Sequence, residues 1–460
     1  MLLSNISYID ITQNYSLPML GYGDRSEWSK GVSDNIYAYL WTLKNEKGSY
    51  NWIILDLCFL NISTISLLKN KLCLESEIDY ENTFISTTHT HSAPDLNKLY
   101  KEKNIRIDFN LYLEEFETRL INLLRNSKKN LEKSEIFIST QKCSIGTNRR
   151  LYCEILDDEV FILKIISNKK VNGIVVYYSC HPTVLGSENL KISADWVGIV
   201  RTKLQKIYNV PVMFVQGAHG DIDPISRGKL HLNDPKQSIG ASHKELVKIS
   251  DSFVNSFKKN FETLKFTKTK KFVVEEKICQ IPTKFGKIDS QKYLSLKNKW
   301  EKKFINFLKL EKINFDEPET LNEKVKKQCI YKNLDDDQII YWIAEQYKYF
   351  AFVNTFKQVA IPNDGYVNLK ITYFDFDKIV LACSPVEFLS AIGIEQKKLN
   401  KHRKILVVSL FGGYLGYFPH YKNYYERDKD LGYETISSIF DEKSSKIFKR
   451  FNQTYLDHGP

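Results

Sequence analysis

Residues 80–95, YENTFISTTHTHSAPD, place two histidines directly after a run that is typical of a β-strand. Side chains two positions apart on a strand point to the same face, so His89 and His91 are expected to lie side by side at its end. Two such imidazoles favour a metal site or a proton-transfer site that needs partners from elsewhere in the chain. A pair of exposed loop histidines is the alternative.

The chain around this stretch alternates predicted strands and helices. Strands are predicted at residues 35–43, 52–60, 135–141, 160–167, 173–180, 211–216, 366–374, 378–383 and 404–410. Helices are predicted at 108–126, from 195 onward, through 246–261 and at 386–399, because apolar side chains recur there at helical spacing. Residues 285–358 are helical in pattern and highly charged, with helices at 289–311 and 337–357. The sequence therefore predicts an α/β fold, a single domain over residues 1–460 with a mixed sheet and a Lys-rich helical insertion at about 285–358.

Composition narrows the class of protein. The chain has 460 residues, of which 43% are hydrophobic and 13% aromatic, enough for a large core. It contains no apolar run of about 18 residues, so a membrane-spanning helix is not expected, and its first residues do not resemble a secretion signal. The eight cysteines are scattered and form no CxxC pair. They predict buried, reduced thiols in a cytoplasmic protein rather than a disulfide framework or a cysteine-based zinc site.

The net charge of +11 comes largely from lysines between about 258 and 333. Such density is compatible with a non-enzymatic protein that binds polyanions. It is more typical of solvated helix faces, and no nucleic-acid-binding motif accompanies it. Nucleic acid is therefore not an expected partner.

Reactive groups gather where predicted strands end, which is where functional groups of α/β proteins usually lie. His89 and His91 form the first group and Glu387 belongs to another, SPVE at 384–387. The others are SCHPT at 179–183, QGAHGDIDP at 216–224 and GGYLGY at 412–417. Two histidines and one glutamate from separate strand ends would suit a catalytic zinc ion, which keeps a position for water. Zinc makes its water acidic and polarises a carbonyl, as hydrolysis of an amide or ester requires.

Several of these segments resemble, in order, motifs of the neutral/alkaline (non-lysosomal) ceramidase family, especially its shorter bacterial members. The matching segments are Asp10–Thr12, Met19–Gly23, Thr88–Pro94, Asn148–Arg150, His181–Gly186, Ser193–Gly198, Gln216–Pro224, Pro385–Phe388, Tyr414–Tyr417 and Tyr433–Glu434. The resemblance spans nearly the whole chain. It implies the fold of the N-terminal catalytic domain of these enzymes and one zinc ion per chain.

The resemblance assigns a role to individual positions. It implies zinc ligands at His89, His181, Glu387 and Tyr417. It places His91 and Arg149 beside the scissile amide, and it makes Asp195 and Asp221 orienting groups behind the ligands.

Each assignment has a structural alternative. His181 could cap a strand end, and Glu387 could cap the following helix. Arg149 could pair with a structural carboxylate, and Tyr417 is one of 27 tyrosines. Asp221 and Asp223 could shape a turn. The family offers no role for His219, which we expect in the pocket wall rather than as a ligand.

The chain departs from the family at Asp223, where ceramidases carry a serine near the scissile bond. A carboxylate cannot donate a hydrogen bond unless it is protonated, so Asp223 is expected to bind a cationic group, act as a base or hold the loop. The chain also has no room for the immunoglobulin-like C-terminal domain of the long family members. Both departures argue against an enzyme that acts on membrane ceramide.

The predicted function is that of a zinc-dependent amidohydrolase that cleaves an N-acyl compound, with His91, Arg149 and Asp223 as catalytic residues. The expected partner is a small N-acyl molecule, and peripheral membrane contact remains open. A zinc-dependent esterase, or a deacetylase of a sugar or cell-surface precursor, is the alternative enzyme. The oligomeric state is not predicted.

Overall fold

The computed structural model describes residues 1–22, 25, 27–103, 106–150, 153–227, 240–284, 364–424 and 433–459. The helical insertion predicted at about 285–358 lies outside the described residues.

A nine-stranded mixed sheet forms the centre of the fold, in the order β11-β10-β9-β7-β1-β3-β4-β5, with β13 added to β7. Its strands are β1 Leu3–Asp10, β3 Tyr37–Asn45, β4 Gly48–Leu55, β5 Thr83–Thr87, β7 Glu132–Lys142, β9 Glu159–Ser167, β10 Lys170–Tyr178, β11 Val212–Gln216 and β13 Thr267–Lys268. The pairs β4–β5 and β10–β11 are parallel, whereas the other pairs are antiparallel. The predicted mixed α/β class is therefore confirmed.

A second sheet of four strands, β14-β15-β16-β18, packs against the first. Its strands are β14 Val273–Pro282, β15 Tyr366–Asp375, β16 Ile379–Cys383 and β18 Lys404–Val408. The alternation of side chains along a strand explains the layering. On β10, Val175 and Tyr177 enter the core between the two sheets, and Val176 and Tyr178 face the helices.

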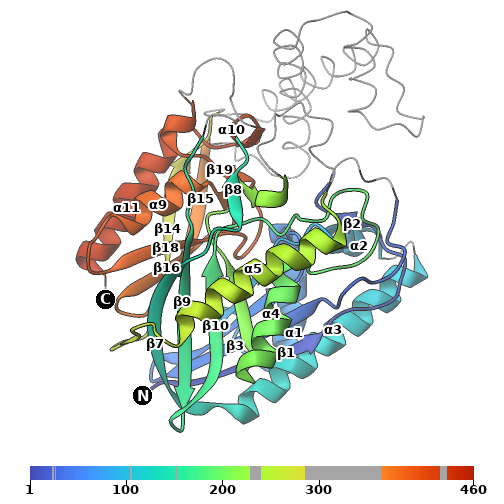
Figure 1. Cartoon of the computed structure of the whole chain (residues 1–460), viewed down its shortest axis with the longest axis horizontal. Coiled ribbons are helices and arrows are strands. Elements are labelled where there is room, and N and C mark those ends of the chain that lie inside the picture. Colours follow the sequence, from blue (N-terminus) through green and yellow to red (C-terminus); the bar gives the residue numbers. More distant parts are fainter. Residues whose placement is uncertain are drawn as a thin grey trace, which may run out of the picture.

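Helices cover both outer faces (Figure 1). The large sheet carries α1 Ile62–Ser76, α2 Leu96–Glu102, α3 Ile107–Ser127, α4 Asp195–Tyr208 and α5 His243–Phe261. The small sheet carries α9 Ser390–Lys397 and α11 Ser444–His458, and the short α10 spans Tyr433–Ser437. The order of layers is thus helices, large sheet, small sheet, helices.

Local sequence explains the helix boundaries. The hydroxyl of Ser242 accepts a hydrogen bond from the backbone N–H of Glu245 and caps the start of α5. Along α5 the predicted stripe, which includes Leu246, Phe253 and Phe257, is buried against β9, β10 and β11. Helix α9 begins later than predicted, at Ser390, because Glu387 and Phe388 pair with another strand.

Three two-stranded ladders at the edge of the sheets join segments that are far apart in sequence. The ladder β2–β6 pairs Met19–Leu20 with Ala93–Pro94, and β8–β12 pairs Gly146–Asn148 with Ile222–Pro224. The third, β17–β19, pairs Glu387–Phe388 with Tyr417–Phe418. Each ladder therefore joins two of the motifs that the sequence singled out.

The seven cysteines among the described residues are all buried thiols that form no disulfide. No helix in the described ranges is both long enough and apolar enough to cross a membrane.

Candidate metal centre

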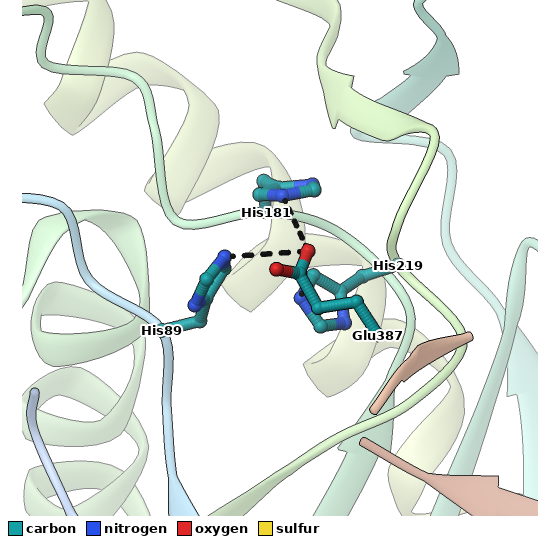
Figure 2. Close-up of side chains that lie close together, drawn as sticks. All are labelled: His89, His181, His219 and Glu387. Atoms are coloured by element: carbon teal, nitrogen blue, oxygen red, sulfur yellow. Dashed lines mark ion pairs between the residues drawn. The ribbon is translucent and has the colours of Figure 1, made fainter. Parts of the chain in front are cut away.

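Four side chains from four separate strand ends meet in the interior of the protein (Figure 2). His89 follows β5, His181 follows β10, His219 follows β11, and Glu387 begins β17 after β16. All four are buried, with at most 2% of their surface exposed. One donor atom from each lies within 4.8 Å of the others. The arrangement is a candidate metal centre built from three imidazoles and one carboxylate.

The backbone fixes which nitrogen of each imidazole faces the centre. Nδ1 of His89 lies 2.8 Å from the carbonyl oxygen of Cys58, Nδ1 of His181 lies 3.0 Å from that of Ile222, and Nδ1 of His219 lies 2.9 Å from that of Gly217. A carbonyl only accepts hydrogen bonds, so each Nδ1 carries the proton and donates. In a neutral imidazole Nε2 then has a lone pair, which is the form that binds a metal.

The three Nε2 atoms surround one oxygen of Glu387. The distances from Oε2 of Glu387 to Nε2 of His89, His181 and His219 are each 3.5 Å. Nε2 of His181, Nε2 of His219 and Oε2 of Glu387 are buried and have no hydrogen-bond partner among the described residues. Leaving buried polar atoms unsatisfied costs about 1–3 kcal/mol each. A bound cation would satisfy all three, so the residues present fit a metal ion.

Electrostatics keep His219 and Glu387 in metal-binding forms, whereas at His89 the nearby Glu387 carboxylate outweighs burial and raises the pKa of the ring well above its usual value. Burial and the neighbouring imidazoles of His181 and His89 lower the pKa of His219 well below its usual value, so its ring is neutral. Burial opposes ionisation of Glu387, but the histidines around it hold its pKa well below the usual value, so the carboxylate is charged. Neutral imidazole nitrogen and carboxylate oxygen are ligands that zinc takes in proteins.

His91 lies beside the centre, as predicted, but not for the predicted reason. Nε2 of His91 is 3.3 Å from Nε2 of His89. Strand β5 ends at Thr87, so neither histidine is on a strand, and His89 has a left-handed backbone with a φ of 73°. The turn, rather than the alternation of a strand, brings the two rings together.

Gly21 controls the position of His91. Its φ is +123°, and a Cβ there would overlap Cγ, Cβ and Cα of His91. Gly31 has a nearly equal φ of +127°, but nothing lies within 4 Å of the place where its Cβ would be. Both glycines therefore have a similar positive φ, but only Gly21 lies against His91.

Gly21→Ala is therefore expected to displace His91 and to slow the hydrolysis predicted from the sequence by about a hundredfold, the size of effect that misplacing a group by about 1 Å can have. Gly31→Ala is the matched control, because it adds similar backbone strain without touching His91. Steady-state kinetics and thermal unfolding of both variants provide the check. Equal losses of turnover in the two variants would contradict this role for Gly21.

Arg149 and Asp223 form a buried ionic cluster next to the centre. The guanidinium of Arg149 donates to Glu434 at 2.6 Å and to the carbonyl of Gly220 at 2.7 Å, and it lies 3.5 Å from Oδ1 of Asp223. Asp223 also lies 3.8 Å from Nε of Arg227. Burial raises the pKa of Asp223, but the two arginines outweigh burial and keep it below the usual value. Asp223 is thus an ionised partner of two arginines.

Tyr417 is adjacent to Glu387 across the ladder β17–β19. Its hydroxyl lies 3.4 Å from a nitrogen of Arg149, so this tyrosine is linked to the ionic cluster.

Asp195 and Asp221 do not orient the imidazoles, which is the role that the family resemblance implied. Asp195 accepts hydrogen bonds from the backbone N–H groups of Val184, Leu185 and Trp196. Asp221 accepts from Asn148 and from both the backbone and the hydroxyl of Ser390. These aspartates fix loops near the centre, whereas backbone carbonyls orient the imidazoles.

His219, which was expected in the pocket wall, lies in the metal centre. His219 lies three residues after the end of β11, just as His181 lies three residues after the end of β10. Because β10 and β11 are parallel neighbours, their ends meet at the same edge. This equal spacing after two adjacent strands was the signal that could have identified His219.

The fold is similar to that of known ceramidases. The structure of neutral ceramidase from Pseudomonas aeruginosa matches with a TM-score of 0.67 and 13% identity, over 99% of this chain and 74% of that one. A second structure, described as ceramidase complexed with C2, matches with a TM-score of 0.67 and 12% identity, over 99% of this chain and 75% of that one. Neither a family model nor a curated protein sequence matches the chain. At this identity the similarity establishes the ceramidase-like fold.

Proposed function

We propose that the protein is a metal-dependent hydrolase that cleaves the amide bond of an N-acyl compound. The observation that carries the proposal is the convergence of buried imidazole lone pairs on the Glu387 carboxylate. The ceramidase-like fold supports the choice of an amide, since the two similar structures are of ceramidases. The nitrogen-rich ligand set favours zinc over magnesium or calcium, which prefer oxygen ligands.

His89, His181 and Glu387 would hold the metal in this proposal. The metal would acidify a water molecule and polarise the scissile carbonyl. His91, beside His89, would accept or donate a proton at Nε2. Arg149 would hold positive charge next to the centre, because Glu434 and the carbonyl of Gly220 fix its guanidinium.

Asp223 would act through the arginines. A carboxylate with a lowered pKa is a poor proton acceptor, so its contact with Arg149 and Arg227 favours the loop-holding role among the three left open by the sequence. In this proposal Asp223 affects substrate choice by setting the position of Arg149.

The proposed substrate is a small N-acyl molecule, with peripheral membrane contact still open, and the proposed location is the cytoplasm. Among the described residues, seven buried cysteines that form no disulfide support a reducing compartment. One domain over residues 1–460 remains the simplest organisation.

The test compares an N-acyl amide with the ester of the same acyl group, using zinc-loaded and chelator-treated protein. We expect amide hydrolysis that disappears on chelation, returns with zinc and is absent in His89→Ala. The control variant is His402→Ala, which changes an exposed histidine and should retain activity. Full amidase activity without metal would refute the proposal, and turnover of the ester alone would favour the esterase alternative.

A further inference from the structure

We propose that His219 is a metal ligand, so that three imidazoles and one carboxylate hold the ion, and that Tyr417 is not required to bind it. This inference rests on the metal dependence proposed above but not on the bond that is cleaved. The family resemblance implies two histidines, a glutamate and a tyrosine, so His219 would give this chain a different ligand set.

The donor atoms are spaced as zinc ligands are. A zinc ion with bonds of about 2.0–2.1 Å keeps ligand atoms about 3.4 Å apart at the tetrahedral angle, and a fifth coordination position would remain for the water that the proposed function requires. The distance from Oε2 of Glu387 to Nε2 of His219 is 3.5 Å, the same as the distances to His89 and His181. His219 therefore meets the criterion for a ligand as well as the two histidines that the resemblance assigned.

The His219 ring uses only one of its two nitrogens in hydrogen bonds to the described residues. The side chain is fully buried, its Nδ1 donates to the carbonyl of Gly217, and its Nε2 has no hydrogen-bond partner among the described residues. A histidine with a purely structural role in a core would be expected to use both nitrogens, because an unsatisfied buried acceptor costs about 1–3 kcal/mol. Coordination of a cation removes that cost.

Hydrogen bonds connect the loop of His219 to the strand of Glu387. The carbonyl of Gly217, which orients His219, also accepts a hydrogen bond of 2.8 Å from the hydroxyl of Ser409. The same hydroxyl accepts from the backbone N–H of Phe388, the residue after Glu387. The N–H of Gly220 donates to the carbonyl of Phe388 at 2.9 Å. The loop that carries His219 is thus tied to the strand that carries Glu387, so the two donors are positioned together.

Close packing leaves the loop little freedom. A Cβ on Gly217 would overlap Ser179 and Tyr177, and a Cβ on Gly220 would press on Leu389, the carbonyl of Phe388 and the ring of Tyr417. The loop can therefore approach the centre only because glycines flank Ala218 and His219.

The ligand set has a chemical consequence. Three neutral imidazoles and one carboxylate leave a divalent ion with a net positive charge, whereas a phenolate in place of one imidazole would neutralise it. The hydroxyl of Tyr417, which accepts a hydrogen bond of 3.4 Å from Arg149, would then be available as a hydrogen-bond donor to substrate.

The experiment measures metal binding rather than catalysis. Zinc affinity is determined by competition with a chromogenic chelator for the wild type, His219→Ala and Tyr417→Phe. We expect His219→Ala to bind zinc more than about a hundredfold more weakly, beyond the 10–100-fold typical of losing a group that only orients a ligand. Tyr417→Phe should change the affinity less than about tenfold. Added imidazole should restore part of the affinity of His219→Ala by filling the space of the lost ring.

X-ray absorption at the zinc edge of the wild-type protein provides a measurement that needs no variant to fold. Scattering from three imidazoles is expected, and two imidazoles would overturn the proposal. So would unchanged zinc affinity in folded His219→Ala, or an equal loss in Tyr417→Phe. Three imidazoles in a protein that hydrolyses no amide would leave this inference intact and refute the proposed function instead.

Discussion

Glu387→Gln is expected to lower the affinity for zinc by more than about a hundredfold and to abolish hydrolysis. Among the described residues, Glu387 provides the only carboxylate of the centre, and the three imidazole nitrogens lie 3.5 Å from its Oε2. Glutamine keeps the size of the side chain but loses the charge that attracts a cation into a buried site, where such a charge is worth most. Losing an orienting group alone typically costs 10–100-fold in metal affinity. Equilibrium competition with a chelator measures the effect.

Glu395→Gln is the matched control for this substitution. Glu395 lies on α9, with its Oε1 3.5 Å from Nε2 of His420 and 2.9 Å from Nζ of Lys449. The substitution is the same as at Glu387, and the carboxylate is likewise 3.5 Å from a histidine nitrogen. Glu395, however, does not belong to the metal centre. We expect zinc affinity like that of the wild type. If both variants bound zinc as tightly as the wild type, Glu387 would not be a ligand.

Asp56→Asn is expected to reduce the free energy of unfolding by about 3–5 kcal/mol, because it leaves a buried arginine without its counter-charge. Arg201 is 2% exposed and Asp56 is 0% exposed. The two terminal guanidinium nitrogens of Arg201 donate to the carboxylate of Asp56. That carboxylate also accepts from the backbone N–H of Tyr37 and from the hydroxyl of Thr88, the residue before His89. The loss of stability should therefore extend to the loop that carries His89.

Asp251→Asn tests the same change on the surface. Asp251 pairs with Lys203, which belongs to the same helix as Arg201, but the two side chains are 47% and 37% exposed. Exposed ion pairs contribute about 0–1 kcal/mol. Urea unfolding of both variants compares the two positions, and a similar small loss at Asp56 would show that the buried pair is not a major source of stability.

Local patterns in the sequence predicted much of the fold. The strand at 160–167 and the helix at 108–126 correspond to β9 and α3 with small shifts at their ends, because alternating and helical periodicities depend on neighbouring residues. Helix α9 was predicted too long, since a ladder between Glu387 and Tyr417 depends on two distant segments. The helices predicted at 289–311 and 337–357 lie outside the described residues and stay predictions.

The sequence identified most residues of the metal centre but not how the fold brings them together. The sequence pointed to His89, His181 and Glu387, and the structure brings these three together. It also brings in His219, which the family pattern had left in the wall. Asp195 and Asp221 hold backbone loops instead of imidazoles. Carbonyl groups of Cys58, Ile222 and Gly217 orient the rings, and such backbone groups have no signature in sequence.

The sequence by itself determined the strands and helices, the chemistry at the strand ends and the class of reaction to be proposed, because these follow from residue types and short-range spacing. Only the tertiary structure decided which side chains share one centre. That decision depends on parallel pairing of β10 with β11, on the ladder β17–β19 and on the left-handed turn at His89. These features fix distances between residues hundreds of positions apart, which spacing along the chain does not specify. His89 and His91 both lie at the centre, where His181 and His219 provide two further imidazoles.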